Sequence, residues 1–191
     1  RENGVQLKCE ASCGGGIPIV STLEHDLVGN EILTIAGILN GTTNYILSRM
    51  DAEGADYADV LADAQAKGYA EADPSADVDG FDAASKTAIL ASIGFRTRVT
   101  TDDVYQQGIR TIAAEDIAVA HDLGYTIKLL GIARNTPKGV DVRVHPTMIP
   151  LDHQLAKVSG AMNAVYVVGD AVGETMFYGA GAGSFPTASA V

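Results

Sequence analysis

The chain is poor in the residues that mark several common classes of protein. Its 191 residues include no Trp, two Cys, and 13 Lys and Arg against 24 Asp and Glu, for a net charge of -11. Nucleic-acid binding needs clustered Lys and Arg opposite the phosphates, so this scattered basic content argues against a nucleic-acid partner. The chain also has no run of about 18 apolar residues and no signal-peptide core near its start. We therefore expect a soluble, cytoplasmic protein without a membrane partner.

The two cysteines do not match a known metal motif. Cys9 and Cys13 are separated by three residues, and there is no further Cys and no nearby His, unlike a zinc site. In a reducing compartment we expect free thiols. One of them could be an acylated nucleophile, as in semialdehyde dehydrogenases, but that role favours a basic neighbour and only Lys8 is close in sequence. This activity stays open as an alternative.

The residues that are present predict a globular domain with a sizeable core. Hydrophobic residues make up 47% of the chain and charged residues 19%, with 21 Gly. Hydrophobic periodicity and turn signals predict helices and strands along the whole length. The helices are expected at 17–27, 42–54, 56–68, 80–95 and 113–124, the second capped by Thr42 or Thr43. The strands are expected at 5–11, 31–40, 125–134, 139–149, 162–170 and 174–183. This order favours an α+β fold, a mainly antiparallel sheet of about four or five strands with helices on one face.

The stretch of greatest chemical interest runs from 68 to 91. In the helix expected at 80–95 the only charged residues are Asp82 and Lys86, four apart and therefore on one helical face. We expect that face to be the buried one, because it continues through Ile89, Leu90 and Ile93. A buried carboxylate and ammonium are costly unless paired, and catalytic groups tend to lie at such sites. An ordinary surface ion pair is the alternative that spacing alone favours.

Two further segments resemble ligand-binding loops only in part. The acidic loop at 71–80 carries alternate carboxylates but fails the EF-hand pattern, so solvated acids are the expectation. The GAGAG run at 179–183 lacks the G-x-G-x-x-G spacing of a dinucleotide loop. Neither segment identifies a ligand by itself.

Four motifs, in order, carry a resemblance to a known family: EASCGGGIPIV, GILNGTTNYIL, GYAEADPSADVDGFDAASKTAILA and FYGAGAGSFPTASAV. Together they resemble the substrate-binding, catalytic part of homoserine dehydrogenase over nearly the whole chain. The most specific feature is Glu71, followed by Asp82 and then Lys86 at the family's spacing. The resemblance implies interconversion of L-aspartate 4-semialdehyde and L-homoserine with NADP or NAD, on the route to threonine, methionine and isoleucine.

The same resemblance implies roles for individual residues. Lys86 matches the proton donor and acceptor, while Glu71 and Asp82 match the acids that bind the amino and hydroxyl ends of the substrate. An ammonium suits this reaction, because reduction of an aldehyde puts negative charge on its oxygen. The other pocket positions are Gly41, Thr42, Tyr69 and Asp77. Gly179, Gly181 and Gly183 match positions beside the cofactor. Glu10, Cys13, Gly15 and Ile17 match positions that bind a sodium ion, mostly through backbone carbonyls.

The resemblance also implies a domain organisation. Residues 1–16 correspond to a remnant strand and turn of a Rossmann-type nucleotide-binding domain, and 184–191 to a helix that returns to it. Residues 17–183 correspond to the substrate-binding, catalytic and dimerisation domain, with the open sheet face pairing two copies. Because the nucleotide fingerprint is missing, we expect the 191 residues alone to be inactive. A catalytically silent amino-acid-binding or dimerisation module is the alternative from a different functional class.

Overall fold

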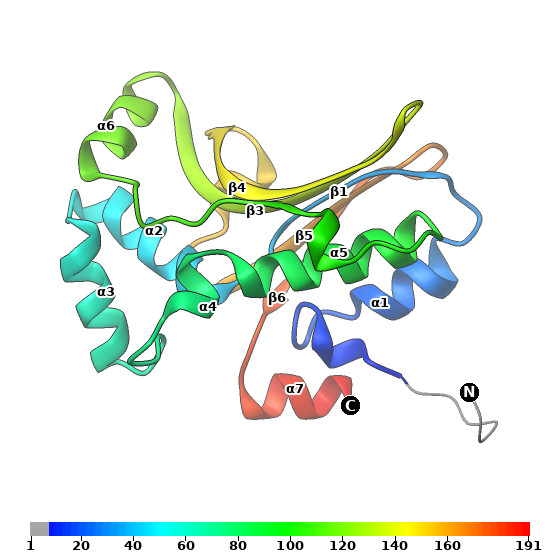
Figure 1. The fold of residues 1–191 in the computed structure, drawn as a ribbon, viewed down its shortest axis with the longest axis horizontal. Helices are drawn as coiled ribbons and strands as arrows, with labels where there is room; N and C mark the ends of the chain where they lie inside the picture. Colours follow the sequence, from blue (N-terminus) through cyan, green and yellow to red (C-terminus); the bar gives the residue numbers. More distant parts are fainter. Residues whose placement is uncertain (1–7) are drawn as a thin grey trace.

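Six strands form one sheet in the order β2-β4-β3-β1-β5-β6, and helices lie along one face of it (Figure 1). The structure is a computed structural model that describes residues 8–191. The strands are β1 Ile32–Ile38, β2 Tyr105–Gln106, β3 Tyr125–Thr136, β4 Gly139–Pro150, β5 Met162–Gly169 and β6 Gly173–Ala180. All neighbouring pairs are antiparallel except β2 and β4. The predicted α+β fold is confirmed. The sheet has one strand more than the predicted four or five, and the strand that the sequence does not predict is the two-residue β2.

The helices follow the predicted segments closely. The longer ones are α2 Gly41–Glu53, α3 Tyr57–Ala66, α5 Phe81–Gly94, α6 Ala114–Asp122 and α7 Ser184–Ala190. The shorter ones are η1 Glu10–Ser12, α1 Ile19–Ser21, η2 Thr22–Asp26, α4 Ser75–Val78, η3 Thr101–Asp103 and η4 Gln154–Lys157. Helix α2 ends at Gly54, whose φ of 63° suits a residue without a Cβ. Its N-cap is Asn40, not Thr42 or Thr43, because the Asn40 side chain accepts from the backbone N–H of Thr43.

The strand expected at 5–11 is wrong for the part that the structure describes. Residues 8 and 9 have no regular structure, and Glu10–Ser12 form the short 3-10 helix η1. Residues 5–7 lie outside the described residues. An alternating pattern makes a strand only where a neighbour supplies hydrogen bonds, and this segment packs against α7 instead.

Helix α5 buries a different face from the one predicted. The fully buried positions are Ala83, Ala84, Thr87, Ala88, Leu90 and Ala91. Asp82 and Lys86 lie at the flank of this face, as do Ile89 and Ile93, all of them half-buried. Small side chains let the helix approach the sheet closely, and this moves the larger residues to the edge of the contact. Of the predicted face, only Leu90 is fully buried.

A buried lysine lies in β3, away from α5. Lys128 is 2% exposed, and its Nζ donates to Asn44 Oδ1, Ser48 Oγ and the carbonyl of Val158 at 3.3, 3.1 and 2.8 Å. Burial lowers the pKa of Lys128 to about 8, and the charge of Asp51 opposes this only in part. The three contacts join α2, β3 and the segment that follows η4.

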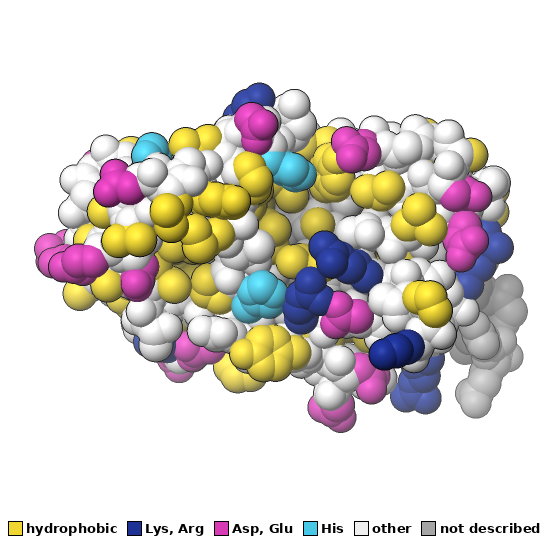
Figure 2. All heavy atoms as spheres, turned by 90° about the horizontal axis from the view of Figure 1, so that it is seen from above, with side chains coloured by type: hydrophobic (Ala, Val, Ile, Leu, Met, Phe, Trp, Pro, Cys, Tyr) yellow, Lys and Arg dark blue, Asp and Glu magenta, His cyan; other side chains and the backbone are white. Residues whose placement is uncertain are grey.

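The face of the sheet opposite the helices carries a second, smaller core. Residues of β1, β3, β4 and β5 pack there against Leu155 and Val158 of the η4 region. Toward β6 the apolar side chains are only partly covered, among them Tyr166 and Met176. Figure 2 looks onto the molecule from above in the sense of Figure 1 and shows hydrophobic side chains beside a group of basic and His side chains. Within residues 8–191, no helix is long and apolar enough to cross a membrane.

Candidate active site

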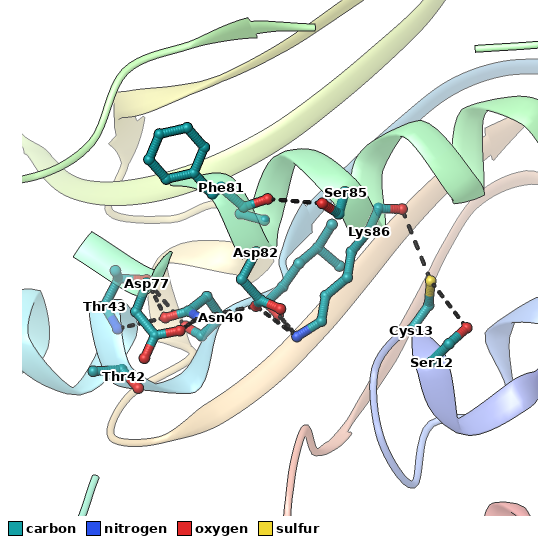
Figure 3. Close-up of polar contacts among 12 residues, drawn as sticks. Ser12, Cys13, Asn40, Thr42, Thr43, Asp77, Phe81, Asp82, Ser85 and Lys86 are labelled. Atoms are coloured by element: carbon teal, nitrogen blue, oxygen red, sulfur yellow. Dashed lines mark hydrogen bonds and ion pairs between the residues drawn. The ribbon is translucent and has the colours of Figure 1, made fainter. Parts of the chain in front are cut away.

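Four segments meet at one end of the sheet: the end of β1, the start of α2, the acidic loop with α4, and the first turns of α5 (Figure 3). Lys86 lies at the centre of this meeting point. Its Nζ donates to Asp82 Oδ2 at 2.7 Å and to the carbonyl of Leu39 at 3.0 Å, and its side chain is 19% exposed. An ammonium has three N–H groups, so one has no acceptor among residues 8–191 and is available to a ligand. The predicted pairing of Asp82 with Lys86 is therefore present in a partly buried setting.

Asn40 also belongs to this cluster, and it is not among the site residues predicted from the sequence. Its Nδ2 donates to Asp77 Oδ1 at 2.7 Å and to Asp82 Oδ2 at 3.0 Å. Its Oδ1 accepts from the backbone N–H and the hydroxyl of Thr43 at 2.9 and 3.0 Å. In the sequence, an Asn directly before a helix indicates an N-cap. It does not indicate that the amide also binds two carboxylates.

The acidic loop is more ordered than the predicted run of solvated acids. Asp73 accepts from the backbone and side chain of Ser75, and Asp79 forms an ion pair with Arg110. Those two acids therefore stabilise the loop while they stay at the surface, so the expectation of solvated side chains agrees with their exposure but does not include these contacts. Hydrogen bonding to Ser75 also holds the pKa of Asp73 below its usual value.

Glu71 lies in the same loop but does not join the Asp82 and Lys86 cluster. Its carboxylate makes no hydrogen bond or ion pair with another of the described residues, and the residue is exposed. Its backbone carbonyl accepts from Gln65 Nε2 at 2.9 Å, which fixes the chain at this point. The carboxylate thus keeps its full capacity for an incoming group.

The other predicted pocket positions surround the start of α2. The hydroxyl of Thr42 donates to the carbonyl of Tyr69 at 2.7 Å, which ties the loop to the helix. The ring of Tyr69 is half exposed and packs on Tyr45 with centroids 4.7 Å apart. A Cβ at Gly41 would lie 2.8 Å from the carbonyl oxygen of Ala161, so only glycine allows this close approach.

Cys13 is buried beneath the lysine. Its thiol lies 3.9 Å from the backbone carbonyl of Lys86 and beside the hydroxyl of Ser12. Burial raises the pKa of the Cys13 thiol to about 11, against the smaller opposing effects of the Ser12 hydrogen bond and the Lys86 charge. A buried thiol that stays protonated at neutral pH is a poor nucleophile, which weighs against an acylating role for this residue.

The predicted sodium positions lie at the start of η1, which begins at Glu10, and in the turn that joins η1 to α1. The two carboxylate oxygens of Glu10 accept from the backbone N–H groups of Val20 and Ser21 at 2.8 and 2.7 Å. The Cys13 side chain is turned toward Lys86, so Cys13 could offer a cation only its backbone oxygen. Among residues 8–191 there is no cluster of three His, Cys, Asp or Glu side chains of the kind that holds a metal ion. An oxygen set built mainly from carbonyls remains compatible with a hard cation.

The glycines predicted beside the cofactor lie where two distant segments touch. The backbone N–H of Gly16 donates to the carbonyl of Ala180 at 3.0 Å, and a Cβ at Gly15 would overlap the carbonyl of Gly181. A Cβ at Gly181 would in turn overlap the buried side chain of Asn163. Packing alone therefore requires glycine at 15 and 181.

The two other glycines of this run have more room. Gly179 belongs to the end of β6, and a Cβ there would meet only Ile17. Gly183 precedes α7 with a φ of 119°, which favours glycine. Neither residue lies against another backbone.

Comparison with known proteins gives a consistent result. The profile described as homoserine dehydrogenase matches residues 18–191. A homoserine dehydrogenase of Synechocystis is 58% identical over 194 residues, covering 100% of this chain and 45% of the relative. One from Corynebacterium glutamicum is 55% identical over 192 residues, covering 98% and 43%. The chain thus spans less than half the length of these curated relatives.

Solved structures agree with the sequence relatives. The crystal structure of a homoserine dehydrogenase from Thiobacillus denitrificans has a TM-score of 0.97 and 53% identity, covering 99% of this chain and 44% of that one. A hyperthermophilic archaeal homoserine dehydrogenase in complex with NADPH has a TM-score of 0.83 and 28% identity, covering 99% and 54%. The fold described above is therefore similar to one half of these proteins.

Proposed function

Because this chain belongs to the homoserine dehydrogenase family, we propose that it forms the substrate-binding and catalytic part of an enzyme that interconverts L-aspartate 4-semialdehyde and L-homoserine. The product would feed the synthesis of threonine, methionine and isoleucine. The observation that carries the proposal is the partly buried Lys86, held by Asp82 and the Leu39 carbonyl with one N–H left over.

Lys86 would act on the oxygen that changes its charge during the reaction. In the reducing direction its remaining N–H donates to the aldehyde oxygen, stabilises the negative charge that develops and then delivers the proton. In the oxidising direction the unprotonated amine accepts the proton of the homoserine hydroxyl. Asp82 keeps the amine in place, because a side chain held at two points has little freedom to swing away.

The acids around Lys86 suit an amino-acid substrate. We propose that Glu71, whose carboxylate has no partner among the described residues, binds the substrate ammonium, and that Asp82 binds the hydroxyl end, with Asp77 beside Asp82 on the Asn40 amide. Gly41, Thr42 and Tyr69 would form the wall of the pocket, since the Thr42 contact to the Tyr69 carbonyl closes that side. An ammonium placed among carboxylates gains charge-assisted hydrogen bonds.

A nicotinamide cofactor, NAD or NADP, would supply the hydride acceptor and donor. We propose that residues outside these 191 bind most of it, with Gly179, Gly181 and Gly183 at its edge. Gly179 and Gly183 fit this role, whereas glycine at 181 is already explained by Asn163. Residues 1–16 and 184–191 would then belong to the nucleotide-binding part and 17–183 to the substrate domain. On this view the 191 residues alone do not turn over homoserine.

Three further assignments complete the proposal. Glu10 and the carbonyls of Cys13, Gly15 and Ile17 would hold a structural sodium ion. The partly covered sheet face would pair two copies into a homodimer, because exposed apolar sheet surface favours association. A cytoplasmic location fits two free cysteines.

The decisive experiment follows reduction of NAD or NADP at 340 nm by the complete protein with L-homoserine. We expect homoserine-dependent turnover, and a loss of turnover in Lys86→Met with an unchanged melting temperature. Turnover that survives the substitution would show that Lys86 does not carry the reaction. It would favour the alternative, in which these residues form a catalytically silent amino-acid-binding module. The 191-residue fragment serves as a second test, since near full-length rates from it would contradict the expected need for a nucleotide domain.

A further inference from the structure

We propose that Asn40 is a positioning residue that fixes Asp82, and through it Lys86, by holding two carboxylates on a single amide group. The inference rests on the proposed function, in which Lys86 transfers the proton. Asn40 lies between β1 and α2 and donates to Asp77 and to Asp82, the acid that pairs with Lys86. Its side chain makes no hydrogen bond with Lys86 itself among the bonds of the described residues.

The amide of Asn40 can adopt only one orientation here. Its Oδ1 faces the backbone N–H of Thr43, which can only donate, so this atom must be the acceptor. The opposite side, Nδ2, then faces Asp77 Oδ1 and Asp82 Oδ2 with one N–H for each. A rotation by 180° would place the NH2 group against the backbone N–H of Thr43 and the amide oxygen against two carboxylates, so these three bonds fix the orientation.

The junction between β1 and α2 therefore holds both members of the catalytic pair. The backbone carbonyl of Leu39 accepts from Lys86, and the side chain of the next residue, Asn40, donates to Asp82. Two adjacent residues thus set the distance between the carboxylate and the ammonium. Because the Asn40 side chain also caps α2, the helix and the pair share one anchor.

Asn40 also separates two negative charges. Asp77 Oδ1 and Asp82 Oδ2 lie on the same nitrogen, at 2.7 and 3.0 Å. Without that donor the two carboxylates would face each other across the gap, and like charges at short range repel. Lys86 would still attract Asp82, but its carboxylate would lose one of the two donors that fix its Oδ2.

Two substitutions separate positioning from helix capping. Asn40→Ser keeps an N-cap oxygen for Thr43 but is too short to reach the acids, and Asn40→Asp keeps the cap and the shape but replaces the donor with a negative oxygen. Ser, Asp and Asn cap helices about equally well, so a purely capping role predicts near wild-type activity for both variants. Positioning predicts a fall in kcat, with Asn40→Asp the more severe.

We would measure kcat and KM for homoserine with the complete protein. The expected fall in kcat is about 10-fold for Asn40→Ser and about 100-fold for Asn40→Asp, at or below the lower end of the 10²–10³-fold cost of losing a donor that touches the reacting oxygen, because Asn40 acts through Asp82. The KM should change less than kcat, because Glu71 remains in place. Asp103→Ala is the matched control: it removes a cap at η3, outside the site, and should keep kcat within twofold.

Each outcome decides the proposal. Values of kcat within twofold of wild type for both Asn40 variants would overturn it, as would unfolding of both, which would make the residue purely structural. A wild-type protein without homoserine-dependent turnover would refute the proposed function instead. The crystal structure of Asn40→Ser then still tests the inference, because we expect the Asp82 carboxylate to leave its present rotamer. An unchanged distance between Asp82 and Lys86 would overturn it whatever the reaction.

Discussion

Two lysines of this protein lie in surroundings of opposite character. Lys86 is partly exposed, paired with Asp82, and keeps one N–H without a partner among residues 8–191. Lys128 is 2% exposed, contacts no carboxylate of these described residues, and directs its three N–H groups to Asn44, Ser48 and Val158. Burial alone would mark Lys128 as the unusual residue, and its pKa, lowered to about 8, supports that reading.

If Lys86 is the lysine that transfers the proton, as proposed above, then unused bonding capacity indicates a reactive lysine better than a perturbed pKa does. Lys128 has every donor occupied and no route for a substrate, so its altered pKa is a consequence of packing. Lys86 is held by two acceptors and still has one N–H that no described residue binds. Structural groups also have perturbed pKa values, and geometry must decide between the two cases.

The largest expected effect comes from exchanging each lysine for methionine in the complete protein. Lys86→Met should lower kcat by about 1,000-fold, because proton transfer by a positioned group contributes 10²–10⁴-fold. Lys128→Met should keep kcat within a few-fold while changing stability. Steady-state kinetics and urea unfolding of both variants check this. A greater loss of kcat in Lys128→Met than in Lys86→Met would reverse the comparison.

The pH dependence of stability gives a second test of Lys128. Below pH 8 the lysine is protonated in both the folded and the unfolded chain, so the cost of burying its charge is fully present. As the pH rises from about 8 toward 10.5, the folded chain releases this proton first, and the free energy of unfolding should increase by up to about 3 kcal/mol.

Urea unfolding at pH 7 and pH 10 measures this increase as the difference between wild type and Lys128→Met. Cys13, whose raised pKa has the opposite effect in the same range, cancels because both proteins contain it. Equal pH dependence in the two proteins would show that Lys128 is not buried as a charge.

A third prediction concerns Glu71, the acid without a partner among the described residues. Glu71→Gln should raise the KM for homoserine about 10-fold with a smaller change in kcat, since one charge-assisted hydrogen bond is worth about 1.5–3 kcal/mol. Glu115→Gln, at an exposed position in the first turn of α6, is the matched control and should change neither constant. An unchanged KM in Glu71→Gln would remove Glu71 from the site.

The smallest expected effect concerns the cysteines. At pH 7.5 iodoacetamide should modify the exposed Cys9 and leave the buried Cys13 intact, with activity changing less than about twofold. Mass spectrometry locates the label, and treatment in urea should label both residues. Modification of Cys13 in the folded protein together with loss of activity would restore the acylating alternative.

Local patterns predicted the fold better than the site. Helix α5 and its Asp82 and Lys86 pair follow from the spacing of residues within 14 positions, and the strands follow from alternation and turns. The hydrophobic pattern predicts the wrong buried face for α5. It gives little weight to small residues, and Ala83 and Ala84 are the ones that pack closely in the core. The described part of the strand expected at 5–11, residues 8–11, has no strand beside it to pair with.

The missed residues depend on partners far along the chain. Asn40 donates to Asp77 and Asp82, which lie 37 and 42 positions later in the chain. Its position before a helix predicts the N-cap but not these two hydrogen bonds. Lys128 is one polar residue within a strand pattern, which does not indicate burial, and its side chain is buried against α2 and Val158. Such contacts arise from the topology of the sheet, which one sequence specifies only indirectly.

The contact between the Gly15 turn and Gly181 has a mechanical consequence. The backbone hydrogen bond from Gly16 to Ala180 and the close contact of Gly15 with Gly181 hold together two segments, the one that leads into α1 and the one that leaves β6. The two segments therefore move as a pair, so a rotation of structure attached to one of them carries the other with it. Two chain segments held together resist twisting more than one segment does, and this double connection leads into the turn that carries Cys13, whose thiol lies 3.9 Å from the backbone carbonyl of Lys86.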